Sequence, residues 1–258
     1  MSKKILLFPS VFFFFVVSVS SAQAASDSNR YLIHSSSSFS RKALGTVRHD
    51  FGDSFSVELN GFQFRMAKML KLDIEKVPAL YISAHGNGQA TTAIVASDTI
   101  VDVAVLDTAT SHGISVMDII GERSRLYEVC NSRGVCFADD VAVAIRNAVH
   151  DGADVINMSF GAEDANDLMD AAINAAAREG VLLVAAAGNN GPFLDTVEYP
   201  ASHPSVVSVG ALTREGDVAE WSSRGDVDVW EIGEYENVAG TSIASAYFTA
   251  RQVHLLEQ

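Results

Sequence analysis

Short apolar runs in the second half of the chain constrain its fold more than any other sequence feature. The clearest is Val181–Ala187, in which every residue is apolar, and residues 101–106, 154–159 and 205–212 are similar runs. A strand in a parallel sheet gives such a run because helices cover both of its faces. We therefore expect an α/β fold built on a parallel sheet.

Helical patterns separate these runs. Residues 139–150 carry a stripe of apolar side chains at helical spacing, and residues 168–178 form a second helical segment. Alternating strands and helices predict helices on both faces of the sheet. Ligand sites in such folds lie at the carboxyl ends of the strands, and Asp107, Gly161 and Asn189 each follow a predicted strand.

A smaller α+β unit precedes this pattern. Strands are predicted at residues 31–34 and 55–59, a helix at 64–71, and an extended segment at 77–82. A unit of this size buries little apolar surface by itself. We expect it to depend on contact with the larger unit.

The first residues have the pattern of a secretory signal peptide. Lys3 and Lys4 precede the apolar run 5–17, and Ala22-Gln23-Ala24 has the form of a cleavage site. A membrane anchor is the alternative, but the apolar run is short for a span. We expect residues 1–24 to be removed and the protein to be secreted or periplasmic, without a membrane partner after removal.

Charge and cysteines limit the partners. The net charge of −14 argues against nucleic acid and anionic membranes as ligands. Cys130 and Cys136 flank a turn-rich spacer, and in an oxidising compartment this pattern favours a disulfide. A metal-binding pair is the alternative, but no further cysteine or histidine cluster completes a site. We expect no metal and no cofactor.

Several segments carry chemistry in a fixed order. These are Val105-Leu106-Asp107-Thr108, His112-Gly113, 155–161, 185–191 and 240–246, the last opening a helix at Gly240-Thr241-Ser242. Together they resemble the subtilisin-like serine proteases (subtilases), and the resemblance runs from about residue 101 to 250. The chain order Asp, His, Ser distinguishes this family from other folds with the same triad.

The resemblance implies a role for each residue. Ser242 would be the nucleophile that forms an acyl-enzyme, and His112 would act as the general base and then the general acid. Asp107 would hold the imidazole in the correct tautomer. Asn189 would donate its side-chain N–H to the oxyanion.

The resemblance also places the substrate. Ser159, Phe160 and Gly161 match the segment that pairs with an extended polypeptide. Glu198 stands where the family commonly has a glycine, at the base of the pocket for the residue before the scissile bond. A carboxylate there would favour Lys or Arg in polypeptide substrates. The alternative is that Glu198 faces solvent or pairs with a nearby cation.

Residues 55–82 resemble the inhibitory prodomain of the same family. We therefore expect three regions: a signal peptide (1–24), an inhibitor-type prodomain (25–84) and a compact subtilisin-like catalytic domain (85–258). The prodomain would be an intramolecular inhibitor of a zymogen, released by a cut near residues 81–88.

The pattern departs from the family most clearly between Asp107 and His112, which are separated only by residues 108–111. A spoiled triad would leave a pseudoprotease that acts by binding, and an esterase is a third, weaker alternative. His85 and His150 are competing candidates for the base. The presence of Asp107, His112, Asn189 and Ser242 together favours a peptidase over a pseudoprotease, and the Ser159-Phe160-Gly161 strand favours a peptide over a small ester as substrate.

Overall fold

A computed structural model describes residues 29–35, 44, 46–82, 85–86 and 101–257. The predicted signal peptide (1–24) lies outside the described residues and stays a prediction. Among the described residues, helices are all too short or too polar to meet the requirements of a membrane crossing.

A six-stranded parallel sheet forms the centre of the larger unit, with the strand order β14-β13-β12-β10-β7-β8. Its strands are β7 (Val103–Asp107), β8 (Ser124–Glu128), β10 (Val155–Met158), β12 (Leu182–Ala186), β13 (Val207–Leu212) and β14 (Val229–Ile232). The apolar runs in the sequence correspond to the central strands, which are buried on both faces.

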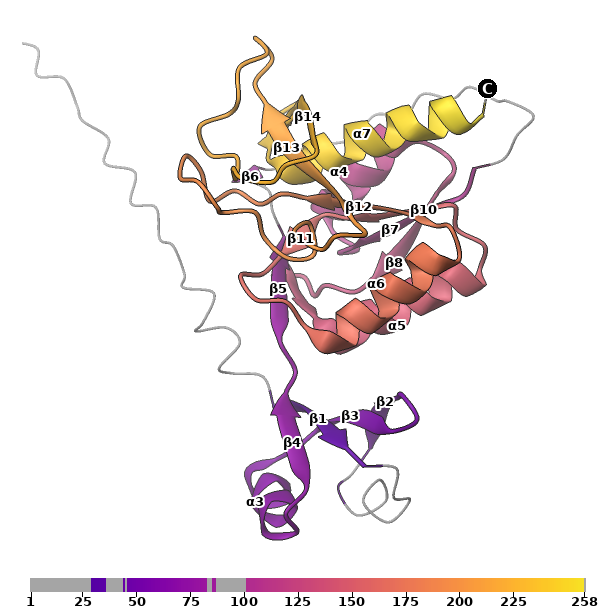
Figure 1. The fold of residues 1–258 in the computed structure, drawn as a ribbon, viewed down its shortest axis with the longest axis vertical. Coiled ribbons are helices and arrows are strands. Elements are labelled where there is room, and N and C mark those ends of the chain that lie inside the picture. The colour runs from indigo at the N-terminus through magenta and orange to yellow at the C-terminus, as the bar shows by residue number, and fades with distance from the viewer. Residues whose placement is uncertain (1–28, 36–43, 45, 83–84, 87–100, 258) are drawn as a thin grey trace, which may run out of the picture.

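Helices cover the two faces of this sheet (Figure 1). One face carries α4 (Ser111–Ile120) and α7 (Thr241–Leu256), and the other carries α5 (Ala138–His150) and α6 (Asp167–Arg178). This arrangement confirms the predicted α/β architecture. It also brings the start of α4 and the start of α7 to the carboxyl ends of the strands.

Strands β7, β10 and β12 each contribute to two hydrophobic cores because successive side chains point to opposite faces. Val103 and Val105 pack on the side of α4 and α7, whereas Ala104 and Leu106 pack on the side of α5 and α6. The sheet therefore lies between two layers of buried apolar side chains. Such packing fixes the strand ends, and with them the loops that follow.

The N-terminal unit is an antiparallel sheet with one helix, shown in indigo and purple in Figure 1. Its elements are β1 (Arg30–His34), β2 (Val47–Asp50), β3 (Ser54–Glu58), α3 (Gly61–Met69) and β4 (Asp73–Lys76). A capping box starts α3: Asn60 accepts from the backbone of Gln63, and the Gln63 side chain accepts from Asn60 N–H. Ile33, Phe55 and Val57 form a small separate core.

Strand β5 (Ala79–Ile82) leaves the N-terminal unit and enters the larger one (Figure 1). It is the middle strand of the sheet β11-β5-β9, between β11 (Phe160–Gly161) and β9 (Val135–Phe137), and is antiparallel to both. Strand β6 (His85–Gly86) then pairs with β16 (Val238–Ala239), which pairs in turn with β15 (Glu234–Tyr235). The chain thus contacts the larger unit on both sides of residues 83–84.

Candidate active site

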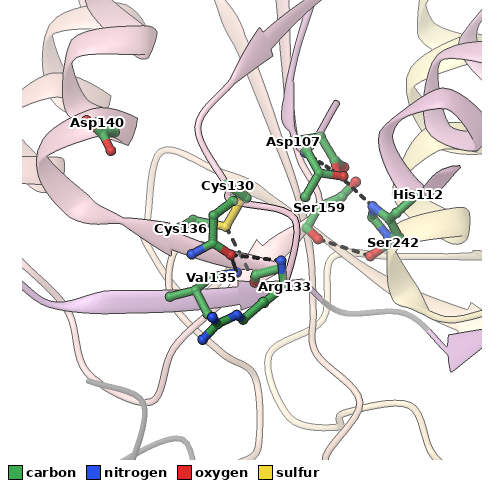
Figure 2. The surroundings of a disulfide bond; sticks show 12 residues. Asp107, His112, Cys130, Arg133, Val135, Cys136, Asp140, Ser159 and Ser242 are labelled. Atoms are coloured by element: carbon green, nitrogen blue, oxygen red, sulfur yellow. Dashed lines mark hydrogen bonds and ion pairs between the residues drawn. A yellow bond between two sulfur atoms is a disulfide. The ribbon is translucent and has the colours of Figure 1, made fainter. Parts of the chain in front are cut away.

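Asp107 and His112 form a hydrogen-bonded pair at the carboxyl edge of the sheet (Figure 2). Asp107 is the last residue of β7 and His112 lies in the first turn of α4. Their atoms Oδ1 and Nδ1 are 2.8 Å apart, although only five positions separate the residues. The Asp107 side chain is fully buried and Oδ1 also accepts the Thr108 N–H at 2.6 Å. The carboxylate is therefore held in place from two directions.

A glycine makes the short connection possible. A Cβ atom on Gly113 would lie 2.1 Å from the Thr108 carbonyl oxygen and 3.2 Å from the Asp107 Cβ. Only a residue without a side chain allows α4 to start this close to the end of β7. The hydroxyl groups of Thr108 and Thr110, 2.7 Å apart, link the two ends of the turn.

Ser242 lies in the first turn of α7, which packs against α4. Its hydroxyl donates a hydrogen bond to the Ser159 carbonyl oxygen at 3.1 Å, as Figure 2 shows. The Nε2 atom of His112 is buried and has no hydrogen-bond partner among the described residues. The outer nitrogen of the imidazole is therefore available to a proton donor at this edge.

Asn189 follows β12 and has a fixed amide orientation. Its Oδ1 accepts hydrogen bonds from the Thr241 backbone N–H at 3.1 Å and from the Thr241 hydroxyl at 3.2 Å. Its Nδ2 is buried and has no partner among the described residues. A buried donor without an acceptor costs free energy unless a ligand supplies one. The two N–H bonds of Asn189 Nδ2 therefore have no acceptor among the described residues.

A chain of buried polar groups runs beneath Ser242, and the sequence patterns did not predict it. Thr249 donates to Asn157 Oδ1 at 3.1 Å, and Asn157 Nδ2 donates to Ser159 Oγ at 2.9 Å. Ser159 Oγ lies 3.3 Å from Ser245 Oγ, which donates to the Ser242 carbonyl at 2.9 Å. The available signal was an asparagine inside an apolar strand. This network joins β10 to α7 next to the nucleophile candidate.

The segment predicted to bind substrate already pairs with the chain itself. In β11, Phe160 pairs with Ile82 and Gly161 pairs with Tyr81. On its other edge Tyr81 pairs with Val135 of β9. An extended polypeptide therefore fits between β9 and β11, and β5 occupies that place in the intact chain.

Glu198 lies against the two glycines that line this region. A Cβ atom on Gly161 would be 2.2 Å from Glu198 Oε2, and one on Gly188 would be 2.8 Å from it. The amide of Asn190 donates to Glu198 Oε1 at 2.6 Å. The carboxylate thus fills the space between the substrate segment and the loop that carries Asn189.

The predicted disulfide between Cys130 and Cys136 is present and lies beside the pair Asp107–His112 (Figure 2). The loop that it closes begins where the backbone N–H groups of Val129 and Cys130 donate to the Asp107 carbonyl, at 3.0 and 3.3 Å. It ends in β9, which pairs with β5. The disulfide therefore connects the backbone next to the end of β7 with strand β9.

The competing histidines lie elsewhere. His85 is in β6, where it pairs with Ala239. His150 is at the end of α5 with a largely exposed ring, 3.4 Å from Asp151. Asp107 is instead hydrogen-bonded to His112.

Comparison with known proteins places these features in a family. Residues 75–258 match the model of the subtilase family. Subtilisin from Bacillus sp. (strain TA39) is 34% identical over 154 residues, which cover 47% of this chain and 37% of that protein. Subtilisin DY from Bacillus licheniformis is 32% identical over 144 residues, which cover 51% of this chain and 53% of that protein.

The matched part of the chain thus spans between about a third and half of these two curated relatives. Among solved structures, the prenylagaramide maturation protease PagA superposes with a TM-score of 0.57 at 26% identity, covering 62% of this chain and 76% of the other. The patellamide maturation protease PatA gives 0.56 at 25% identity, covering 62% and 79%.

Proposed function

Because this chain belongs to the subtilase family, we propose that it is a serine endopeptidase that cleaves polypeptides through Asp107, His112 and Ser242. The observation that carries the proposal is the 2.8 Å hydrogen bond between buried Asp107 and His112. The short connection was the main reason to doubt the triad. With the pair formed, the chain has an oriented base beside a serine at a helix N-terminus.

The proposed reaction starts with attack by Ser242 Oγ on the scissile carbonyl carbon. His112 Nε2 accepts the hydroxyl proton as the C–O bond forms, and Asp107 stabilises the imidazolium through the bond to Nδ1. The imidazolium then donates that proton to the leaving amine as the C–N bond breaks. Water hydrolyses the acyl-enzyme by the same steps, with His112 again the base.

Negative charge on the carbonyl oxygen would be stabilised by Asn189. Thr241 holds Oδ1, so the amide cannot turn without losing two hydrogen bonds, and Nδ2 remains the donor. Preorganised donors of this kind stabilise the transition state more than the substrate. The Ser242 backbone N–H at the start of α7 would be the second donor, aided by the helix dipole.

We also propose a preference for Lys or Arg before the scissile bond, based on Glu198. Its carboxylate lies against Gly161 and Gly188, within the walls of the cleft. Glu198→Gly should reduce kcat/KM for Lys and Arg peptides relative to Phe and Leu peptides, measured with a peptide series varied at that position. Glu215→Gly, in an exposed turn, is the matched control. An unchanged preference in Glu198→Gly would refute the assignment.

The N-terminal unit is proposed to be an inhibitory prodomain, because β5 occupies the place of a substrate strand. β5 ends at Ile82 on β11, and β6 begins at His85 on the strand that precedes Gly240 and Ser242. We place the self-cleavage between Ile82 and His85. Residues 79–86 contain no Lys or Arg. The internal segment therefore does not suit the pocket at Glu198, and we expect self-cleavage to be slow.

Export completes the proposal. The signal-peptide pattern of residues 1–24 directs the chain to a secreted or periplasmic location. The disulfide between Cys130 and Cys136 supports this, because such bonds persist in oxidising compartments.

A pseudoprotease that acts by binding is the alternative, and one observation favours it. The Ser242 hydroxyl donates to the Ser159 carbonyl, and His112 Nε2 has no hydrogen-bond partner among the described residues. For catalysis, the hydroxyl must rotate from Ser159 toward His112. A substrate strand that takes up the Ser159 carbonyl would favour that rotation.

Labelling by a serine-directed phosphonate separates the two functions. The chain is incubated to allow self-cleavage, treated with the reagent and analysed by intact mass, with Ser242→Ala as the control. Labelling of Ser242 that disappears in His112→Ala supports the peptidase. A folded chain that does not cleave itself, and that takes no label at Ser242 after an added protease has removed the N-terminal unit, favours the pseudoprotease.

A further inference from the structure

At the start of α5, two carboxylates lie in contact with basic residues of the N-terminal unit. Arg30 Nη1 is 3.2 Å from Asp139 Oδ1 and 2.5 Å from Asp140 Oδ2. Arg48 Nη2 is 3.1 Å from Asp140 Oδ1, and His49 Nε2 is 2.8 Å from the same oxygen. Within the described part of the chain, the ion-pair partners of these two carboxylates are Arg30, Arg48 and His49, which all belong to the N-terminal unit.

The groups around the Arg30 side chain suit a planar guanidinium. The Arg30 Cζ atom lies 3.9 Å from the centroid of the Phe137 ring, so the planar group stacks on an aromatic face. Two carboxylates at its edge supply acceptors. A planar, delocalised cation fits an aromatic face and two carboxylates better than a compact ammonium does.

Asp139 gives an independent indication that this place requires a cation. Its side chain is fully buried, and its Oδ2 atom has no hydrogen-bond partner among the described residues. Arg48 Nε lies 3.8 Å from this Oδ2 atom, and the Arg30 side chain on the other oxygen is only 14% exposed. A buried carboxylate is costly unless a cation pairs with it, so the site is incomplete when Arg30 leaves.

We propose that Phe137, Asp139 and Asp140 form a receptor for the arginine side chain of an extended polypeptide. Arg30 fills it in the intact chain and holds the N-terminal unit on α5. Once that unit has left, an arginine of an incoming polypeptide takes its place, a step that rests on the proposed peptidase function.

The backbone contacts of residues 77–79 indicate which position of a bound polypeptide would carry that arginine. The Val77 N–H donates to the Arg30 carbonyl oxygen at 3.1 Å, so the two backbones run side by side at this point. Pro78 O accepts from Ala138 N–H, and Ala79 pairs with Phe137. A polypeptide that follows β5 brings its residue equivalent to Val77 next to the receptor. That residue lies five positions before the one that pairs with Phe160.

A metal ion is a poorer occupant of the same carboxylates. His49, Asp139 and Asp140 offer ligand atoms within 4.8 Å of one another. Arg30 and Arg48 already place two positive charges at ion-pair distance from those oxygens. A divalent cation would have to displace both guanidinium groups or tolerate their repulsion.

The test uses the full chain carrying Ser242→Ala, so that peptidase activity is not needed. A recognition sequence for a specific protease is inserted between Gly86 and Val101 and cut, and retention of the N-terminal piece is measured by analytical ultracentrifugation. Arg30→Leu and Asp140→Asn should each weaken retention about tenfold to a hundredfold, because a charged hydrogen-bond partner is removed. Arg65→Lys on α3 and Asp151→Asn at the far end of α5 are the matched controls, with circular dichroism to verify folding.

Two further comparisons test the preference for arginine. Arg30→Lys keeps the charge but should also weaken retention, and full retention by lysine would overturn a guanidinium receptor. The hexapeptide Arg-Pro-Ala-Leu-Tyr-Ile should release the N-terminal piece at about tenfold lower concentration than Val-Pro-Ala-Leu-Tyr-Ile, which copies residues 77–82. Equal release by the two peptides, or unchanged retention in Asp140→Asn, overturns the proposal whatever the phosphonate experiment shows.

Discussion

At the scale of single residues, three buried atoms of the candidate site lack a hydrogen-bond partner among the described residues: Asp107 Oδ2, His112 Nε2 and Asn189 Nδ2. His112 Nε2 and Asn189 Nδ2 both lack a partner among the described residues, while the other polar atom of each side chain is held. In a folded protein such atoms carry a cost, and they are tolerated where a ligand completes them. The two atoms match the proton and the oxyanion that acyl transfer would place there.

The oxyanion role of Asn189 leads to a prediction. Asn189→Ala should lower kcat about a hundredfold to a thousandfold and leave KM nearly unchanged, because the bond forms only in the transition state. Steady-state kinetics on the self-cleaved enzyme measure this. Asn174→Ala, on the exposed side of α6, is the control. A loss confined to KM would show that Asn189 holds substrate instead of the oxyanion.

At the scale of elements, the sequence predicts those helices and strands whose apolar pattern extends over the whole element. The central strands could be predicted from their apolar runs, and α5 and α6 from their helical spacing, because each pattern extends over a full element. Strand β9 could not, since three residues that pair with distant β5 carry no period of their own. Edge strand β14 is partly exposed and gave no apolar run.

The same limit applies to the site. Asp107, His112, Asn189 and Ser242 were predicted from the resemblance of their segments to the subtilase family, and their places after strands or at helix starts agreed with it. Their mutual distances depend on tertiary contacts, above all on how closely α4 approaches the end of β7. The amide orientation of Asn189 depends on Thr241, which lies far away in sequence. No local pattern reports such contacts.

The approach of α4 to β7 can be tested at Gly113. Gly113→Ala should lower kcat about a hundredfold or more, since the added Cβ lies 2.1 Å from the Thr108 carbonyl oxygen and must push His112 away from Asp107. The measurement is kcat together with the pH dependence of kcat/KM. Gly152→Ala, where a Cβ has open space but the φ of +87° strains other residues, controls for a loss of stability caused away from the site. Full activity in Gly113→Ala would mean that the pair does not need the close approach.

The disulfide loop links the site to the cleft edge, and its removal tests that link. By the loop-entropy estimate, the double variant Cys130→Ser, Cys136→Ser should lower the free energy of unfolding by about 2 kcal/mol. Because the loop ends in β9, KM should also rise for peptides long enough to pair with β9. Denaturant unfolding measures the first effect. A comparison of long and short peptides measures the second, and an equal rise in both would contradict a role for β9.

At the scale of the whole molecule, the chain leaving the N-terminal unit supplies strand β5, which lies between β9 and β11 of the larger unit. The N-terminal unit contacts the larger one through β5, whose pairing is largely backbone, and through the ion pairs at the start of α5. Backbone pairing gives affinity without sequence demand, whereas the ion pairs depend on charge. The two kinds of contact should therefore respond differently to pH.

Burial alone would raise the pKa of Asp140, but hydrogen bonds from His49 and Arg30 and the charges of Arg30 and Arg48 outweigh it and hold that pKa well below its usual range. A pKa that docking depresses contributes affinity above the undocked pKa, near 3.9 for an aspartate, and loses it as pH falls below that value. Retention of the N-terminal piece in the cut Ser242→Ala chain should hence weaken between about pH 4.5 and pH 3.

We expect the change to come from Asp140, because its contacts with His49, Arg30 and Arg48 are what lower its pKa. Asp140→Asn should already be weakened at pH 6 and should show a much shallower further loss in acid. Analytical ultracentrifugation at a series of pH values gives the dissociation constant. Circular dichroism at each pH separates undocking from unfolding of the larger unit. If the dissociation constant rises equally steeply with falling pH in the cut Ser242→Ala chain with and without Asp140→Asn, the acid response arises elsewhere in the molecule and Asp140 is not its source.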